Sequence, residues 1–275
     1  MIDNIFDITL DISNSSEDEI EELIELAKSD YYWAIEELKG KVLLHLFVSR
    51  HLTGELIEKL NKTCLKFEIR EVVNWEENFR KSFKGVVVSN FFIRPPWEEE
   101  KDKFIDIIIY PASSFGVGDH ASTQGMLLAI EKIANDGIKV EKALDIGTGS
   151  GILSIAIKKL GIAKKVIAID ISELAIGNAK MNVKLNEVED VFLILGSTYT
   201  LNPNQKFDLI LANIDSESLP KLKPDILNLI SKDGLVIIGG FTNQNRQVLD
   251  LYSESLYLKD TIVIEDWITC IYYNK

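Results

Sequence analysis

Gly147, Gly149 and Gly151 alternate with other residues directly after the apolar run at 143–146. Glycine adopts backbone conformations that side chains forbid, so this spacing allows a tight turn and lets a ligand approach the backbone closely. The apolar residues of the following stretch, 152–160, recur at helical spacing. The pattern therefore predicts a strand, a ligand-binding glycine loop and a helix, in that order.

The spacing of these glycines distinguishes two kinds of nucleotide ligand. A loop for dinucleotides has the pattern G-x-G-x-x-G, whose third glycine would stand where this chain has Ile152. The observed G-x-G-x-G spacing instead favours S-adenosylmethionine, which has no pyrophosphate. We expect the loop and Asp145, at the end of the preceding strand, to surround the methionine and ribose portions of that cofactor. An unrelated doubly wound domain with tight glycine turns is the alternative interpretation.

A carboxylate ends the next apolar run along the chain, at Asp170. At the tip of a second parallel strand, a carboxylate can accept hydrogen bonds from both hydroxyls of a ribose. Ser172 is placed to cap the helix that follows. The glycine loop and Asp170 are each a weak signal, but on consecutive strands they reinforce each other and indicate a nucleoside cofactor.

The third and fourth apolar runs end at Ser197 and Asn213. Many methyltransferases have an acidic residue at the position of Ser197 for the adenine amino group, so here we expect backbone groups to share that contact. Asn213 is expected beside the transferable methyl group, as both a cofactor contact and a catalytic residue. The N/D-P-P-Y motif of enzymes that methylate base amines or glutamine amides is absent. Asp215 is interpreted either as catalytic or as the cap of the next helix.

His120 is the only histidine in a candidate site loop. It can act as a catalytic base or hold the loop in place, and the second role is favoured because histidine is often structural. Cys64 and Cys270 lie far apart in the sequence, so neither a disulfide framework nor a metal site is predicted. Two unpaired cysteines fit a reducing cytoplasm.

The elements that would position these residues alternate between short apolar runs and amphipathic helical stretches. Apolar runs of this kind suit strands buried on both faces of a parallel sheet. The last two runs have no helix between them and predict an antiparallel hairpin at the sheet edge. We therefore predict an α/β fold with a seven-stranded Rossmann-like sheet. Its expected strands are 142–147, 164–171, 191–197, 207–214, 234–240, 257–267 and 267–275.

The first part of the chain, 1–74, predicts a small α+β domain. Its apparent order is strand, helix, strand, strand, helix, strand, which is the ferredoxin-like plan. The expected elements are 8–13, 15–29, 31–38, 41–48, 53–62 and 64–73. The stretch at 31–38 could instead extend the first helix. Residues 75–103 mix aromatic, charged and proline residues and are interpreted as a connector, which leaves 104–275 as the catalytic domain.

Composition limits the classes of function. A length of 275 residues with 46% hydrophobic residues suits a folded protein with a substantial core. A net charge of −13 argues against a nucleic-acid substrate, because phosphate contacts need a basic surface. No apolar run reaches the roughly 20 residues of a membrane helix, and the acidic N-terminus lacks a signal-peptide pattern. The acidity either steers a basic partner or only maintains solubility.

Three segments resemble a specific family. Residues 74–98 are similar to a connector with D-W-x-x-x-W/F and I-x-P-S-W segments, and 115–123 (FGVGDHAST) resembles an F-G-T-G-x-H-x-T-T loop. The ending at 265–275 resembles an E-x-W-x-x-I/L pattern. With the two cofactor motifs, these segments identify the chain as similar to the ribosomal protein L-eleven methyltransferase (PrmA) family, over most of its length.

This resemblance implies a ferredoxin-like domain that docks a large-subunit ribosomal protein. It also implies methylation of lysine side chains and of an N-terminal amine. Carried over by position, Thr123 would contact the cofactor together with Gly147, Asp170 and Asn213, and Phe115 and Gly116 of the loop would join them. The chain departs from the family pattern at Val117, Asp119 and Asp215.

Three alternatives remain open at this point. The chain can be a related methyltransferase for a different protein or a small molecule. It can also be a cofactor-binding adaptor that has lost turnover. A nucleic-acid methyltransferase is the least favoured, because of the acidic charge and the absent N/D-P-P-Y motif. A separate docking domain favours a protein substrate over a small molecule.

Overall fold

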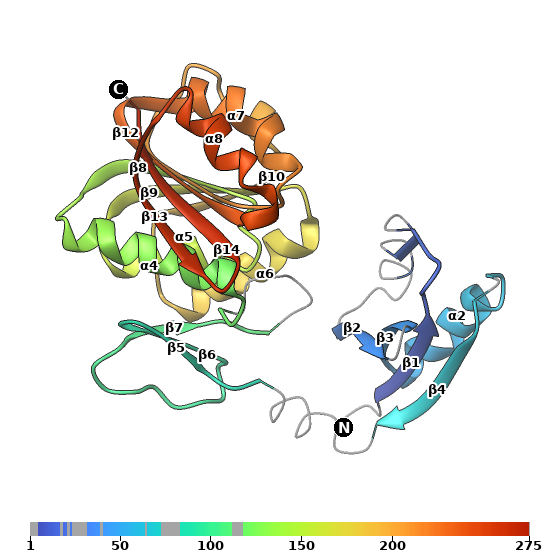
Figure 1. Cartoon of the computed structure of the whole chain (residues 1–275). Coiled ribbons are helices and arrows are strands. Elements are labelled where there is room, and N and C mark those ends of the chain that lie inside the picture. Colours follow the sequence, from blue (N-terminus) through green and yellow to red (C-terminus); the bar gives the residue numbers. More distant parts are fainter. Residues whose placement is uncertain are drawn as a thin grey trace. The chain divides into compact units, whose positions relative to one another are not determined.

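The structure is a computed structural model that describes residues 5–16, 19–20, 23, 32–38, 41–63, 65–72, 83–111 and 118–274. The chain divides into two compact units, Met1–Phe83 and Lys84–Lys275 (Figure 1). The boundary falls inside the stretch expected to be a connector. Each unit has a hydrophobic core of its own and is described by itself.

The smaller unit contains a four-stranded antiparallel sheet in the order β2-β3-β1-β4. Its described elements are β1 (Ile5–Asp11), β2 (Tyr32–Leu38), β3 (Lys41–Ser49), α2 (Arg50–Leu60) and β4 (Phe67–Val72). Residues 32–38 of the stretch expected at 31–38 are therefore a strand and do not extend the first helix. Most of the helix expected at 15–29 lies outside the described residues, as does Cys64. The described elements follow the ferredoxin-like order.

The core of the smaller unit lies on one face of this sheet. Alternate residues of a strand point to the same face, and Ile8 and Leu10 of β1 are fully buried, as are Leu44 and Leu46 of β3. Helix α2 contributes Leu60 to the same cluster. The period-two pattern in the sequence therefore buries one face of this sheet beneath α2.

The larger unit begins with a small three-stranded sheet. Strands β5 (Val86–Val88), β6 (Phe91–Arg94) and β7 (Ile105–Ile108) lie in that order, with β5–β6 antiparallel and β6–β7 parallel. Phe91 and Ile107 are fully buried in the main core cluster of this unit. An ion pair of 2.6 Å joins Arg94 of β6 to Asp106 of β7. This sheet was missed at the sequence level, because its strands are only three or four residues long.

A seven-stranded sheet forms the centre of the larger unit. Its strands are β8 (Val140–Ile146), β9 (Ala163–Asp170), β10 (Val191–Leu195), β11 (Phe207–Asn213), β12 (Ile230–Thr242), β13 (Tyr257–Ile264) and β14 (Trp267–Tyr273). Their order is β10-β9-β8-β11-β12-β14-β13. The first five are parallel, and β14 is antiparallel to both of its neighbours. The predicted seven-stranded sheet with its antiparallel hairpin is confirmed. Within the hairpin, β14 lies next to β12, and β13 forms the edge of the sheet.

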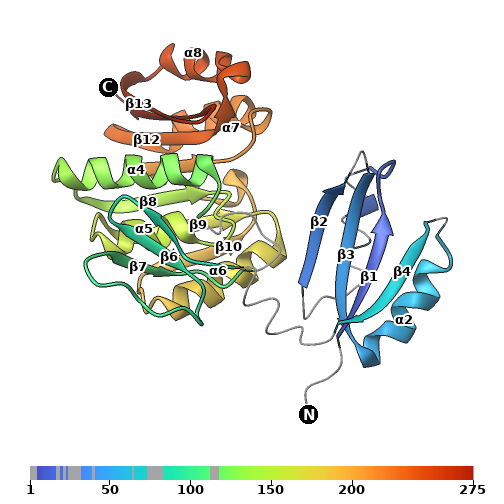
Figure 2. The same ribbon diagram turned by 60° about the horizontal axis from the view of Figure 1, so that its bottom comes forward.

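Helices cover both faces of this sheet (Figures 1 and 2). They are α4 (Ala121–Asn135), α5 (Ile152–Lys159), α6 (Glu173–Leu185), α7 (Ser218–Leu229) and α8 (Gln247–Ser253). One core cluster combines residues of α4 and α5 with one face of the strands, and a second combines residues of α7 and α8 with the other face. Burial of both faces explains why the central strands are nearly continuous apolar runs.

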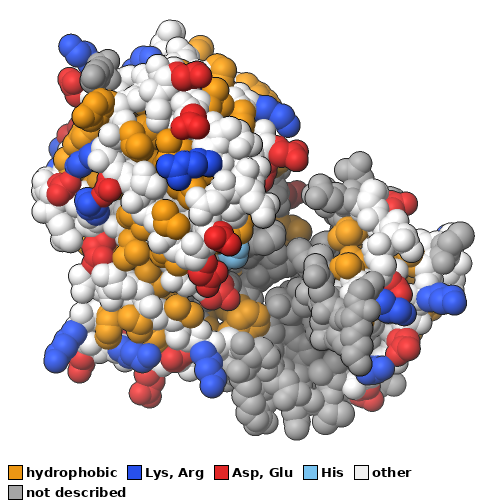
Figure 3. Space-filling view, in the orientation of Figure 1, with side chains coloured by type: hydrophobic (Ala, Val, Ile, Leu, Met, Phe, Trp, Pro, Cys, Tyr) orange, Lys and Arg blue, Asp and Glu red, His pale blue; other side chains and the backbone are white. Residues whose placement is uncertain are grey.

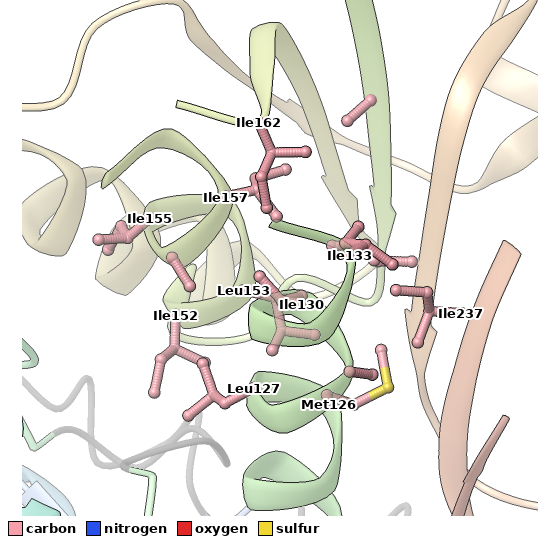
Figure 4. Packing of buried hydrophobic residues seen from close by; sticks show 14 of the residues in the cluster. Met126, Leu127, Ile130, Ile133, Ile152, Leu153, Ile155, Ile157, Ile162 and Ile237 are labelled. Carbon is pink, nitrogen blue, oxygen red and sulfur yellow. The ribbon is translucent and has the colours of Figure 1, made fainter. Parts of the chain in front are cut away.

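Close packing between α4, α5 and the sheet fixes the start of α5. Met126 and Ile130 of α4, Leu153 and Ile157 of α5, and Ile237 of β12 belong to one core cluster (Figure 4). All five side chains are at most 4% exposed. Each such side chain stabilises the fold by about 1.5–3 kcal/mol when fully buried. The helix that follows the glycine loop is therefore held firmly against the sheet.

The surface carries charges of both signs. On the face of the larger unit that Figure 3 shows, acidic and basic side chains are interspersed with apolar ones. Within the described residues, no helix is long and apolar enough to cross a membrane.

Candidate functional site

The glycine loop lies between β8 and α5, and its backbone needs glycine. Gly147, Gly149 and Gly151 have φ angles of 69°, 54° and 80°, which side chains rarely adopt. The backbone N–H groups of Gly147 and Thr148 both donate to the carbonyl oxygen of Ile169, at 2.9 and 3.0 Å. The loop is therefore tied to β9, the neighbouring strand.

The absence of side chains at Gly147 and Gly240 allows the chain that follows β11 to pack closely against them. A Cβ atom added to Gly147 would lie 2.5 Å from Cγ2 of Ile214. A Cβ atom on Gly240, whose φ is 89°, would collide with the Ile214 backbone. The loop after β11 thus lies close to both β8 and β12. This close packing places Asn213 next to the glycine loop.

Asp145 supports the glycine loop from the core. Its side chain is fully buried. Oδ2 accepts hydrogen bonds from the hydroxyls of Thr148 at 2.7 Å and Ser154 at 2.6 Å. Burial raises the pKa of Asp145, although these two hydrogen bonds oppose the shift. Oδ1 is buried without a hydrogen-bond partner, so it is a free acceptor beneath the loop.

Asp170 lies at the end of β9, and backbone groups orient its carboxylate. Oδ2 accepts a hydrogen bond from the N–H of Gly149 at 2.9 Å, and Oδ1 accepts one from the N–H of Ser172 at 3.0 Å. Each oxygen keeps capacity for another donor. The predicted cap is confirmed, since Oγ of Ser172 accepts from the N–H of Ala175 at the start of α6. The carboxylate is therefore fixed in place and can still accept two ribose hydroxyls.

Ser197 lies beyond β10, next to the same strand end. The N–H of Gly196 donates to the carbonyl oxygen of Asp170 at 2.8 Å. Ser197 has an extended backbone and precedes the short helix η1 (Thr198–Thr200). This places Ser197 near Asp170, where an adenine attached to the ribose can be reached.

Large apolar side chains are exposed around Asp170. Ile171 is 77% exposed, Tyr199 is 83% exposed and Leu195 is 51% exposed. Exposed apolar side chains that are rimmed by polar groups can mark a ligand-binding surface. They were not identified from the sequence, although an apolar residue directly after an acidic strand end is a usable signal. They suit the flat faces of an adenine ring.

Asn213 is the last residue of β11, beside α4. Its Nδ2 donates to the hydroxyl of Ser122 over 3.5 Å, a long hydrogen bond. Its Oδ1 is buried without a partner. Buried polar atoms in proteins are nearly always hydrogen-bonded. The amide oxygen of Asn213 is therefore an acceptor that a bound N–H group can satisfy.

His120 caps the N-terminus of α4. Its Nδ1 accepts the backbone N–H of Ser122 at 3.2 Å and lies 2.8 Å from the hydroxyl of the same residue. The ring packs edge-on against Trp267, with centroids 4.5 Å apart. Because Nδ1 accepts, this hydrogen bond assigns the ring proton to Nε2. These contacts are those of a loop anchor.

The remaining loop residues are only partly described. Thr123 is 3% exposed in the first turn of α4, next to Ser122. Phe115, Gly116 and Val117 lie outside the described residues. Their expected roles stay predictions.

Asp215 binds the first turn of α7. Its Oδ1 accepts the backbone N–H groups of Glu217 at 2.9 Å and Ser218 at 2.8 Å. Partial burial raises the pKa of Asp215, but the hydrogen bonds from Ser218 and Glu217 outweigh it and lower the pKa overall. By backbone geometry the cap residue itself is Glu217, which makes no side-chain cap bond. Asp215 therefore does the capping from two residues earlier, which favours the cap interpretation over catalysis.

A column of asparagines on α6 and at its C-cap was not predicted from the sequence. Asn178, Asn182 and Asn186 are at most 6% exposed. Their spacing of four residues puts them on one face of the helix, and this spacing is a signal that the sequence offers. Asn182 reaches the glycine loop directly.

The residues present suit S-adenosylmethionine. Parallel strands bring the glycine loop, Asp170, Ser197 and Asn213 to one edge of the sheet, at the carboxyl ends of β8, β9, β10 and β11. The carboxylate of Asp170 can accept further hydrogen bonds, and the amide oxygen of Asn213 is a buried acceptor without a partner. Among the described residues, no group of His, Cys, Asp or Glu could hold a metal ion.

A sheet of this order, with a glycine loop and an acidic strand end at its carboxyl edge, defines the class I S-adenosylmethionine-dependent methyltransferases. Comparison with known proteins narrows the class. The family model described as ribosomal protein L11 methyltransferase (PrmA) matches residues 11–275. The chain belongs to this family, and its cofactor is S-adenosylmethionine.

Individual relatives agree with the family model. A ribosomal protein L11 methyltransferase of Campylobacter fetus subsp. fetus (strain 82-40) is 34% identical over 90% of this chain and 82% of its own length. One of Campylobacter concisus (strain 13826) is 30% identical over 99% of this chain and 98% of its own length. The crystal structure of a ribosomal protein L11 methylase from Lactobacillus delbrueckii subsp. bulgaricus gives a TM-score of 0.63 at 33% identity, covering 70% of this chain and all of that one. The interpretation as an adaptor without turnover is not favoured.

Proposed function

We propose that this enzyme methylates amino groups of a large-subunit ribosomal protein, at lysine side chains and at the N-terminal amine. The observation that carries the proposal is the extent of the family match, which begins at residue 11 and includes most of the smaller unit. A separate unit with its own core suits recognition of a macromolecule. The substrate named for the relatives is the ribosomal protein L11.

Cofactor binding is assigned to the carboxyl edge of the sheet. Asp170 would accept both ribose hydroxyls, and the glycine loop would approach the methionine portion. Ser197 and the exposed side chains of Ile171 and Tyr199 would contact the adenine. S-adenosylmethionine supplies a methyl group that is activated by a positively charged sulfur. The protein mainly has to hold the two reactants in line, which can lower a barrier by about 7–11 kcal/mol.

The acceptor amine has to be neutral before it can attack. A lysine with a pKa of about 10.4 is neutral in only about one molecule in a few thousand at pH 7. Desolvation lowers the pKa of an amine and increases the neutral fraction. The free amide oxygen of Asn213 would accept an N–H of this amine and point its lone pair at the methyl group.

His120 was a candidate base, but its contacts favour a positioning role. A base needs a free nitrogen lone pair, and the lone pair on Nδ1 already accepts from Ser122. In the neutral ring Nε2 already carries the proton, so Nε2 has no free lone pair with which to accept a proton from the substrate. We therefore assign His120 to anchoring α4, and with it Ser122 and Thr123, beside Asn213.

The other expectations about partners and place stay predictions. The acidic charge supports the expectation that the enzyme makes no direct contact with nucleic acid. We expect no membrane partner, and the few cysteines support a cytoplasmic location. None of these expectations affects the assignment of the reaction.

Labelling with radioactive S-adenosylmethionine tests the proposed substrate. The purified enzyme is incubated with ribosomal proteins from the same cell, and labelled proteins are identified by mass spectrometry. We expect one large-subunit protein to be labelled, at lysine and N-terminal amines. The Asp170→Ala variant serves as the unlabelled control. Label on ribosomal RNA, or only on a protein outside the ribosome, would refute the proposal.

A further inference from the structure

The asparagine column on α6 contains one side chain that joins two parts of the larger unit. Asn182 is fully buried. Its Oδ1 accepts the backbone N–H of Tyr110 at 2.8 Å. Its Nδ2 donates to the carbonyl oxygen of Ser150 at 2.9 Å and to Oδ1 of Asn178 at 3.2 Å. Both donor hydrogens and one acceptor position of the amide are therefore used.

The bond to Ser150 falls at the centre of the glycine loop. Ser150 lies between Gly149 and Gly151, both with positive φ. Glycine loses more conformational freedom on folding than other residues, so a peptide between two glycines needs strong tertiary contacts to stay in one orientation. The Ser150 carbonyl is held by the Asn182 side chain, which is itself fixed by two further partners, Tyr110 and Asn178.

The bond to Tyr110 links this loop to the small sheet. Tyr110 follows β7, and β7 pairs with β6 in the sheet that opens the larger unit. A backbone N–H that loses its partner away from water destabilises the fold, so the Tyr110 contact is not easily replaced. Asn182 thus fixes the glycine loop at a set distance from the end of β7.

We propose that Asn182 is a positioning residue for methyl transfer, which holds the Ser150 peptide in the orientation that S-adenosylmethionine requires. The inference rests on the cofactor site proposed above. It goes beyond that site because the Asn182 side chain is fully buried and is assigned no contact with the cofactor or the acceptor. Its effect passes entirely through the loop backbone.

Asn186, the C-cap residue of α6, provides a matched control one turn further along. It is 4% exposed. Its Oδ1 accepts the N–H of Ile108 at 2.9 Å, and its Nδ2 donates to the carbonyl oxygens of Ile108 at 2.6 Å and Asn182 at 2.8 Å. It therefore binds the same segment, two residues earlier along the chain, with the same chemistry, yet none of these three hydrogen bonds goes to the glycine loop.

The test compares Asn182→Asp with Asn186→Asp in the full chain. Each change keeps an acceptor for the backbone N–H group, of Tyr110 or of Ile108, and removes the amide donors. We expect both to lower the melting temperature by similar amounts. Calorimetry with S-adenosylmethionine should show binding weakened at least about tenfold in Asn182→Asp and within about twofold of the parent in Asn186→Asp.

The pH dependence of binding adds a measurement that a general loss of stability would not reproduce. A buried aspartate has a raised pKa, and its protonated form again offers one donor to Ser150. The affinity of Asn182→Asp for the cofactor should therefore approach that of the parent as the pH falls. The affinity of Asn186→Asp should keep a constant ratio to that of the parent.

Other outcomes are separable. Equal loss in both variants, or parent-like affinity in Asn182→Asp, would overturn the positioning role. Failure of the parent itself to bind the cofactor would instead refute the proposed site. If Asn182→Asp does not fold, Asn182→Ser and Asn186→Ser give the same comparison without a buried charge.

Discussion

Asp170 offers a direct test at the scale of a single residue. Its two oxygens are oriented by the backbone and keep capacity for two ribose hydroxyls. Hydrogen bonds to a charged group contribute about 1.5–3 kcal/mol each. We expect Asp170→Ala to weaken cofactor binding about 100-fold or more by calorimetry, and Asp170→Asn, which keeps one acceptor oxygen, to weaken it less. Unchanged affinity in Asp170→Ala would show that another group binds the ribose.

Substitutions of Asp215 can distinguish a role in helix capping from a role in catalysis. Asp215→Asn keeps the oxygen that binds the N–H groups of Glu217 and Ser218. We expect this variant to retain the parent's stability and methylation rate. Asp215→Ala should lose about 1 kcal/mol of stability in urea unfolding, which is the usual value of a helix cap. If Asp215→Asn is stable but inactive, the carboxylate has a role in the reaction.

The raised pKa of Asp145 implies that the stability of the folded protein depends on pH. Burial raises its pKa in the folded protein above the ordinary value of 3.8. Between that value and the raised one, the folded state binds more protons than the unfolded state, so the contribution of Asp145 to stability falls as pH rises. The melting temperature of Asp145→Asn, minus that of the parent, should therefore increase from acidic to neutral pH. A constant difference would show that the carboxyl does not titrate in this range.

Residue types at strand ends could be predicted from the sequence, because apolar runs locate the ends and parallel strands bring them together. Asp170 and Asn213 lie where they were expected. The buried contacts of Asn182 and the exposure of Ile171 could not be predicted in the same way. Each depends on which neighbours the rest of the chain brings to that position. The anchoring role of His120 was favoured from its residue type, and Ser122 and Trp267 supply its contacts.

At the scale of elements, long apolar runs were sufficient for the main sheet. The position of β14 between β12 and β13 was not predictable, because strand order in a hairpin at a sheet edge depends on which strand pairs inward. The small sheet β5-β6-β7 was also missed. Its strands are only three or four residues long, and β6 pairs with β7 across the stretch from Arg94 to Ile105, so the sequence pattern marks them only weakly.

Two glycines of the larger unit should respond oppositely to alanine. Gly177 lies on the exposed face of α6, and nothing lies within 4 Å of a Cβ atom there. Gly177→Ala should stabilise the protein by about 0.5–1 kcal/mol, because alanine favours a helix. Gly147→Ala should destabilise it, since φ is 69° and the new Cβ atom would lie 2.5 Å from Ile214. Thermal unfolding with cofactor titration measures both, and a stable Gly147→Ala variant with parent-like affinity would contradict the role of the loop.

At the scale of the whole molecule, the two units suggest that cofactor binding belongs to the larger unit and substrate recognition to the smaller one. The larger unit contains the complete seven-stranded sheet and two core clusters of its own. The smaller unit has a separate core around β1, β3 and α2. A net charge of −13 suits association with a basic protein, which is accelerated at low salt and screened at high salt.

This division predicts the behaviour of a shortened chain that begins at Lys84. The shortened protein should fold and bind S-adenosylmethionine with the affinity of the full chain, because the residues assigned to the cofactor all lie in the larger unit. It should fail to label the ribosomal protein, since the unit proposed to recognise it is missing. Calorimetry and the labelling assay measure the two properties separately. Full labelling by the shortened chain would move substrate recognition to the larger unit, and loss of cofactor binding would show that the smaller unit contributes to the cofactor site.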